Sequence, residues 1–263
     1  MKKIIKQFIW KLFGINRILF EQEQFGTKLT TLLAQQQTLL NRIETYQSEI
    51  LMSAKFDDTI NGCPWLKYKN LSAGGWASDY GLMYTLFRIL NDTHPHRILE
   101  FGLGQSSKLI HQYANYYDDT YAVTYEHDVK WIDFFKKGLF DQYKINIHTT
   151  ELEETQYKGE NTLSYKNNCK ELIGQRFDLI LIDAPFGSPR YSRSQILNII
   201  PDCLSDSFCI IMDDYNRNGE KETINELKEI LAQHCIKTFQ TVYRASKNHC
   251  LICSENLHFL TTL

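Results

Sequence analysis

Short apolar segments that alternate with helical stretches are the feature that most constrains the fold of this chain. From residue 64 onward, apolar runs of strand length are separated by stretches with helical periodicity, and several runs end at an acidic residue. The expected strands are residues 97–101, 121–125, 145–149, 177–182, 208–212, 237–243 and 250–254. This alternation predicts the α/β class, with a doubly wound, mainly parallel seven-stranded sheet covered by helices on both faces. The last two strands are joined by a short turn and predict an antiparallel C-terminal hairpin.

The first 55 residues follow a different pattern and predict a long N-terminal helical segment, ahead of a single α/β domain at residues 56–263. One helical face would carry Ile4, Phe8, Leu12, Ile15 and Leu19, and the other Lys2, Lys3, Lys6 and Arg17. A basic amphipathic helix is a candidate for binding an anionic membrane surface. Alternatively, the apolar face packs on the body of the protein or on a second subunit. We favour such packing slightly over binding to a membrane.

Residues 29–50 carry apolar side chains at alternating steps of three and four. The seam consists of Leu29, Leu32, Gln36, Leu39, Ile43, Tyr46 and Ile50. These spacings are those of a coiled coil over three heptads, and the polar Gln36 at an a position can fix the register. We therefore expect a homo-oligomer formed through this helix; a long helix lying on the main domain is the alternative.

Composition excludes several classes of protein. The chain of 263 residues has 29 Lys and Arg against 31 Asp and Glu, a net charge of −2, which excludes a strongly basic nucleic-acid-binding protein. No uninterrupted apolar run reaches the ~18–20 residues that a membrane-spanning helix needs. The seven scattered cysteines are typical of a reducing compartment. We therefore expect a cytoplasmic protein, with peripheral membrane contact open only to the N-terminal helix.

A glycine turn after the first expected strand is the first candidate binding site, because ligands of such sheets bind outside the carboxyl ends of the strands. Gly102 and Gly104 permit a tight turn and the close approach of a ligand to the backbone. Glu100 lies in the mouth of this loop, and Glu126 ends the next strand, where an acid accepts hydrogen bonds from a ribose. A dinucleotide would need a third glycine, and Glu100 would repel its pyrophosphate. A cofactor with a ribose, no phosphate and a cationic amino-acid end fits better.

These residues resemble the motifs of the class I S-adenosylmethionine-dependent methyltransferases, over about residues 75–255. The first family motif matches Glu100, Gly102 and Gly104, with Ser106 in place of the third glycine. Glu126 matches the ribose-binding acid, and Asp183 matches the fourth motif. The resemblance implies a cofactor site formed by Glu100, Gly102, Gly104, Gln105, Ser106, Glu126, Glu151 and Asp183.

A group of acids forms the second candidate site. Asp183 ends one expected strand, and Asp213 and Asp214 follow the next. Carboxylates at the ends of adjacent strands can share a pocket and hold a hard divalent cation such as Mg²⁺. The small catechol-type O-methyltransferases, the nearest resemblance, have an Asp-Asn pair after the fifth strand and a lysine soon after the fourth-strand acid. This chain has Asp213-Asp214 and no lysine in residues 184–190.

The sequence thus predicts an S-adenosylmethionine-dependent methyltransferase that acts on an oxygen atom of a small or glycan-like acceptor. Asp183 and Asp214 are the candidate catalytic bases, with Asp183, Asp213 and Asp214 as candidate ligands of a metal that would assist them. Arg190 and Arg193 favour an acceptor with negative charge, and Arg217 is a candidate for positioning it. Two alternatives stay open. One is an inactive methyltransferase-like scaffold, and the other is an NAD-dependent oxidoreductase on a similar sheet.

Overall fold

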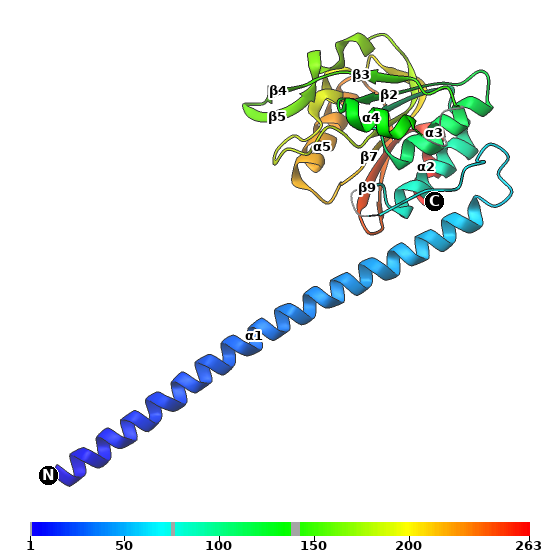
Figure 1. Ribbon diagram of the computed structural model, residues 1–263. Helices are drawn as coiled ribbons and strands as arrows, with labels where there is room; N and C mark the ends of the chain where they lie inside the picture. The colour runs from blue at the N-terminus through cyan, green and yellow to red at the C-terminus, as the bar shows by residue number, and fades with distance from the viewer. Residues whose placement is uncertain (1, 75–76, 138–142) are drawn as a thin grey trace. The chain divides into compact units, whose positions relative to one another are not determined.

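The computed structural model describes residues 2–74, 77–137 and 143–263, and the chain divides into two compact units, residues 1–47 and 48–263. The first unit is part of the helix α1 (Lys2–Thr59), which is labelled in Figure 1. The apolar side chains described in the first unit, at residues 2–14 and 17–47, are exposed to solvent, for example Phe8 by 68% and Leu39 by 56%. The long N-terminal helix predicted from the sequence is therefore confirmed.

The second unit is built on one seven-stranded sheet with the strand order β3-β2-β1-β6-β7-β9-β8. Its strands are β1 (Arg97–Phe101), β2 (Tyr121–Glu126), β3 (Ile147–Thr149), β6 (Phe177–Ile182), β7 (Leu204–Met212), β8 (Thr238–Arg244) and β9 (Asn248–Ser254). The pairs from β3 to β7 are parallel, whereas β9 is antiparallel to both β7 and β8. The predicted mainly parallel sheet and C-terminal hairpin are confirmed.

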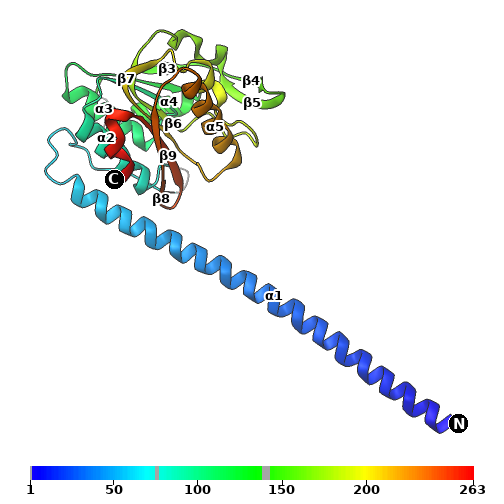
Figure 2. The same ribbon diagram turned by 180° about the vertical axis from the view of Figure 1, so that it is seen from behind.

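Helices cover both faces of this sheet, because successive side chains of each buried strand point to opposite faces. The helices of the second unit are α2 (Tyr80–Thr93), α3 (Gln105–Tyr116), α4 (Val129–Lys136) and α5 (Asn218–Gln233). Within β1, Leu99 and Phe101 pack in the same core as α5, whereas Ile98 packs in the core shared with α2 and α3. Figures 1 and 2 show α5 on one side of the sheet and α2 and α3 on the other.

The structure adds a small hairpin and three short helical segments that the sequence did not predict. The hairpin strands β4 (Leu152–Tyr157) and β5 (Glu160–Tyr165) form a separate two-stranded sheet. The 3₁₀ helices are η1 (Lys166–Leu172), η2 (Ser194–Asn198) and η3 (Glu255–Thr262). Of these elements, η2 bears on the site, because its N-cap residue is Arg193.

No helix in the described part of the chain is long and apolar enough to cross a membrane. All seven cysteines fall in described residues, and each is a free thiol.

Candidate active site

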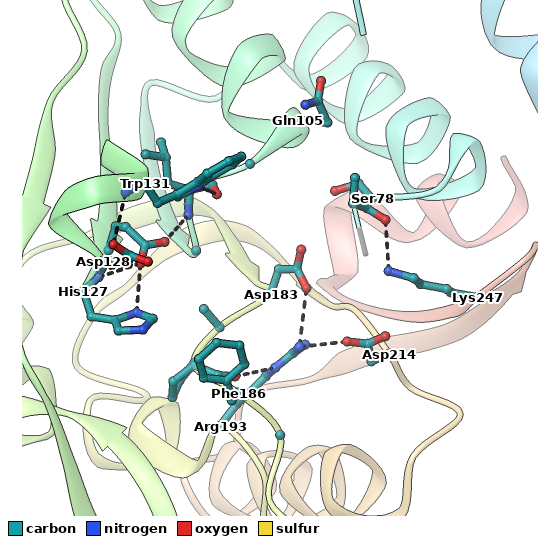
Figure 3. A pocket seen from close by; sticks show the side chains of 18 of the residues that line it. Ser78, Gln105, His127, Asp128, Trp131, Asp183, Phe186, Arg193, Asp214 and Lys247 are labelled. Atoms are coloured by element: carbon teal, nitrogen blue, oxygen red, sulfur yellow. Dashed lines mark hydrogen bonds and ion pairs between the residues drawn. The ribbon is translucent and has the colours of Figure 1, made fainter. Parts of the chain in front are cut away.

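A cavity of about 740 Å³ opens at the carboxyl ends of β1, β2, β6 and β7. Among the residues predicted from the sequence, its wall contains Gly102, Gly104, Gln105, Glu126, Asp183, Arg193, Asp214 and Arg217. It also contains Ser78, Leu103, His127, Asp128, Trp131, Phe186 and Lys247, which the sequence analysis did not assign to a site. Figure 3 shows Trp131 and Asp128 on one side of this cavity and Lys247 and Ser78 on the other.

The glycine turn after β1 forms part of the cavity wall. Glycine occupies its two positions for different physical reasons. Gly102 has a φ of +102°, and a Cβ atom there would lie 2.8 Å from the Cβ atom of Ala184. The backbone itself therefore requires glycine at this position. A Cβ atom on Gly104 would meet no heavy atom within 4 Å. Gly104 thus leaves open space where the turn lines the cavity.

Glu100 and Ser106, both expected in the cofactor site, lie behind this turn and do not line the cavity. Glu100 is fully buried, and its carboxylate accepts hydrogen bonds from the hydroxyls of Ser106 (2.6 Å), Ser107 (2.7 Å) and Thr124 (2.7 Å). Burial raises the pKa of Glu100 to about 7, although these hydrogen bonds act in the opposite direction. We infer that the hydrogen bond between Glu100 and Ser106 stabilises the conformation of the glycine turn.

Glu126 is held in a fixed orientation at the end of β2. One carboxylate oxygen accepts a hydrogen bond from the backbone N–H of Leu103 at 3.0 Å. The other accepts from the backbone N–H groups of His127 (2.7 Å) and Asp128 (2.9 Å). The carboxylate therefore joins the end of β2 to the glycine turn after β1, at the cavity wall.

Asp128 and Trp131 extend this wall along the first turn of α4. Asp128 caps the helix by accepting hydrogen bonds from the backbone N–H groups of Lys130 (2.9 Å) and Trp131 (3.1 Å). The indole Nε1 of Trp131 donates to the carbonyl oxygen of Leu103 at 2.7 Å, which fixes the ring beside the glycine turn. Asp128 comes two residues after the end of β2 and directly before α4, and an Asp at the start of a helix was the available sequence signal.

The three acids of the second candidate site do come together. Asp183, Asp213 and Asp214 each offer a carboxylate oxygen within 4.8 Å of the others. Asp183 and Asp214 line the cavity, whereas Asp213 is fully buried behind it. Burial raises the pKa of Asp183, against the opposing effect of the Arg193 guanidinium. Burial and the two neighbouring carboxylates hold the pKa of Asp213 well above its usual range.

Arg193 is buried among these acids, with 2% of its surface exposed. Its Nη2 atom lies 2.9 Å from Asp214 Oδ2 and 3.4 Å from Asp183 Oδ1, as Figure 3 shows. Its Nη1 atom donates to the carbonyl oxygens of Asp213 (3.0 Å) and Ile182 (3.2 Å). The sequence predicted that Arg193 binds a negatively charged acceptor, but its guanidinium already forms hydrogen bonds with protein groups.

Two predicted site residues, Arg190 and Glu151, lie outside the cavity. Arg190 points toward α5 and forms ion pairs with Glu222 (2.6 Å) and Glu160 (3.1 Å). Glu151 is exposed and pairs with Lys166 at 2.9 Å, because the β4–β5 hairpin brings the residues at its two ends together. Arg217 does line the cavity, with Nη1 3.0 Å from Asp214 Oδ2.

No protein-family model matches this chain, and no curated protein matches its sequence. Solved structures do match. A protein from Klebsiella pneumoniae, assigned as an O-methyltransferase, superposes with a TM-score of 0.51 at 16% identity, over 80% of this chain and 98% of its own. An O-methyltransferase from Bacillus cereus in complex with SAH gives a TM-score of 0.47 at 16% identity, over 81% of this chain and 97% of its own.

A methyltransferase from Geobacter sulfurreducens gives a TM-score of 0.47 at 14% identity, over 81% of this chain and 95% of its own. Sequence identity this low carries information about the fold alone, and the Klebsiella structure, with a TM-score above 0.5, supports this fold. The chain has the fold of the class I S-adenosylmethionine-dependent O-methyltransferases.

Proposed function

We propose that this chain is an S-adenosylmethionine-dependent methyltransferase that methylates an oxygen atom of a small or glycan-like acceptor. The observation that carries the proposal is the shared wall of the cavity. There, the open space at Gly104 adjoins the fixed carboxylate of Glu126 and the two acids Asp183 and Asp214. The fold supports the same assignment.

The glycine turn and Glu126 would hold the cofactor. The turn presents backbone without side chains at Gly102 and Gly104, and Gln105 follows at the start of α3. The Oε2 atom of Glu126 accepts one hydrogen bond, from Leu103, and so keeps a lone pair for a ribose hydroxyl, whereas Oε1 is occupied by His127 and Asp128. Trp131 adds a flat apolar surface beside the turn. When bound, S-adenosylmethionine supplies a methyl group on a sulfonium leaving group.

The acceptor would lie toward Asp183 and Asp214. An acceptor hydroxyl must lose its proton, and the side chain of Asp183 is 25% exposed at the cavity, where it can take one. Its raised pKa makes it a stronger base than an exposed aspartate. Arg217 and Lys247 bring positive charge to the same wall, which favours a polar or anionic acceptor. Alignment of the acceptor within the cavity supplies the remaining catalysis by proximity.

Isothermal titration of the full chain with S-adenosylmethionine and S-adenosylhomocysteine tests the proposal. We expect micromolar binding, and loss of that binding in Gly104→Asp, because the new carboxylate would enter the cavity without disturbing the backbone. Gly26→Asp is the matched control, since it adds the same charge on α1, outside the cavity wall.

The same titration, extended to NADH and followed by a turnover assay, separates the alternatives. Unchanged affinity in folded Gly104→Asp would contradict the assigned site. Binding of NADH in place of both sulfur compounds would favour an oxidoreductase. Cofactor binding without turnover across a broad acceptor panel would favour an inactive scaffold.

We also propose that α1 joins copies of this chain through a coiled coil at residues 29–50. The side chains of Leu32, Leu39 and Ile43 are 50–56% exposed, and they follow the a and d spacing of three heptads. An identical helix presents the complementary seam, which favours a second copy over an unrelated partner. Contact of the basic start of α1 with a membrane surface is the competing outcome. The free cysteines support a cytoplasmic setting.

A further inference from the structure

The acid cluster beside the cavity has the donor set of a divalent cation site. Three carboxylates, from Asp183, Asp213 and Asp214, approach one another within 4.8 Å. Carboxylate oxygen atoms are the ligands that Mg²⁺, Ca²⁺ and Mn²⁺ prefer. What lies between these carboxylates therefore decides whether the cluster can take an ion.

The guanidinium of Arg193 lies between two of them. One nitrogen, Nη2, is in contact with both Asp183 Oδ1 (3.4 Å) and Asp214 Oδ2 (2.9 Å). A Mg²⁺ ion bridging the same two oxygens, at the ~2.0–2.1 Å of its usual bonds, would have to share their intervening space with this nitrogen. Two backbone carbonyl oxygens hold the other nitrogen, Nη1, so the guanidinium is fixed in place.

The backbone of Arg193 has a left-handed conformation, as does that of its partner Asp214. Arg193 has a φ of +60°, in the left-handed region that residues other than glycine seldom adopt. Its side chain is 3% exposed, and its Nε atom lies 3.9 Å from the buried carboxylate of Glu220. A strained backbone that directs a charged side chain into the interior is expected at a functional position.

The charges of the cluster are already matched by cations of the protein. Besides Arg193, Arg217 contacts Asp214 at 3.0 Å, and Lys247 Nζ lies 4.0 Å from Asp213 Oδ2. Lys247 is itself anchored by a 2.9 Å hydrogen bond to the carbonyl oxygen of Ala77. A divalent cation entering this group would gain carboxylate ligands at the cost of strong repulsion from the fixed guanidinium.

We propose that Arg193 takes the place of a divalent cation in this cavity, so that the acid cluster binds no metal. Arg193 acts as a positioning residue: it holds the carboxylates of Asp183 and Asp214 beside the acceptor space in the way a bridging ion otherwise would. Its part in catalysis rests on the proposed function, whereas the exclusion of a metal does not.

Mn²⁺ titration of the full chain, followed by the electron paramagnetic resonance signal of free Mn²⁺, tests this assignment. We expect no loss of that signal with the wild-type chain. Arg193→Met keeps much of the side-chain volume and removes the charge, and we expect it to gain one bound Mn²⁺ per chain. Adding Asp213→Asn to Arg193→Met should abolish the gain. Arg190→Met is the matched control, since it removes an arginine from the same loop but outside the cavity, and it should gain nothing.

Three results would overturn the proposal. The first is stoichiometric Mn²⁺ binding by the wild-type chain that Asp183→Asn abolishes. The second is a folded Arg193→Met variant that gains no Mn²⁺. The third, which decides the matter if Arg193→Met does not fold, is a rise in the wild-type melting temperature on adding Mg²⁺, where we expect no change. None of these measurements needs cofactor or acceptor, so a chain that fails to bind S-adenosylmethionine can still confirm or overturn the role of Arg193.

Discussion

At the scale of single residues, Glu100 couples the stability of the fold to pH. The pKa of this buried carboxyl is raised to about 7 by burial, with a further contribution from Asp183, whereas an unstructured glutamate has a pKa near 4.5. Between these two values the folded chain holds more protons than the unfolded chain. The contribution of Glu100 to stability is therefore complete below about pH 4.5, falls as the pH rises toward 7, and is constant above.

Replacing Glu100 by Gln should remove this dependence, because Gln does not ionise. Its amide oxygen can accept hydrogen bonds from Ser107 and Thr124, and its amide nitrogen can donate to the hydroxyl of Ser106. The wild-type free energy of unfolding should lose on the order of 3 kcal/mol more than that of Glu100→Gln across this pH range. Urea denaturation at several pH values measures the difference. Glu154→Gln, at an exposed glutamate of β4, is the control and should follow the wild type. Parallel profiles for Glu100→Gln and wild type would contradict the assignment.

Gly102 and Gly104 should separate stability from binding. Gly102→Ala forces a side chain onto a φ of +102° and against Ala184, so it should lower the free energy of unfolding by about 1–3 kcal/mol. Gly104→Ala meets no neighbour, so it should leave the melting temperature almost unchanged and weaken cofactor binding. Thermal melting and titration calorimetry on both variants check this contrast. Equal melting temperatures for the two variants would contradict the separate roles of Gly102 in stability and Gly104 in binding.

Residues of the site could be predicted from the sequence where their position at the end of an expected strand determines where they lie. Gly102, Gly104, Glu126 and Asp183 follow strands, and strand ends meet at one edge of a parallel sheet. Arginines gave no such signal. Arg190 and Arg193 are three residues apart in one loop, yet Arg190 is solvent-accessible whereas Arg193 is buried. Only the packing of that loop on its neighbours separates a surface arginine from an interior one.

At the scale of elements, Asp79 joins the start of α2 to the turn between β8 and β9. One oxygen caps the helix by accepting from the backbone N–H of Leu82 at 2.8 Å. The other accepts from the backbone N–H of Lys247 at 2.7 Å and from the hydroxyl of Ser246 at 3.0 Å. This turn carries Lys247 to the cavity wall, so a helix cap also positions a residue of the site.

Asp79→Ala should therefore lower the free energy of unfolding by about 2–3 kcal/mol, since it removes a cap and leaves further donors unpaired in a buried setting. It should also weaken binding in the cavity, because the backbone N–H of Lys247 loses its hydrogen bond to Asp79. Ser246→Ala removes only one of these hydrogen bonds and should cost less. Urea denaturation ranks the two variants, and an equal loss for both would show that the cap and the backbone contact contribute little.

The strands were predictable to different degrees for a physical reason. The strands β1 and β6 match their expected bounds, because strands buried on both faces are mostly apolar, as the sequences RILEF and FDLILI are. The hairpin β4–β5 escaped prediction, because its sequences LEETQY and ENTLSY are largely polar and only part of β5 is buried. A peripheral hairpin of this kind depends on tertiary contacts such as the 3.1 Å hydrogen bond from Tyr157 to Glu226.

At the scale of the whole molecule, the two compact units divide the chain between an exposed helix and a packed body. The end of α1 belongs to the body, where Phe56 and Ile60 are buried in the core and Glu49 accepts a hydrogen bond from the backbone N–H of Tyr80. The apolar side chains described at residues 2–14 and 17–47 are exposed and have no such role. A row of exposed leucines this regular is costly for a monomer, which is why we assign it to self-association.

The double substitution Leu39→Glu and Ile43→Glu in the full chain tests this assignment. It places four acidic side chains in the seam of a dimer, so the oligomer should dissociate, while the melting temperature of the body should not change. Gln37→Glu with Asn41→Glu adds the same charge away from the seam and should leave the mass unaltered. Light scattering after size exclusion gives the masses. A wild-type chain that is monomeric and that sediments with anionic vesicles would instead assign the helix to a membrane surface.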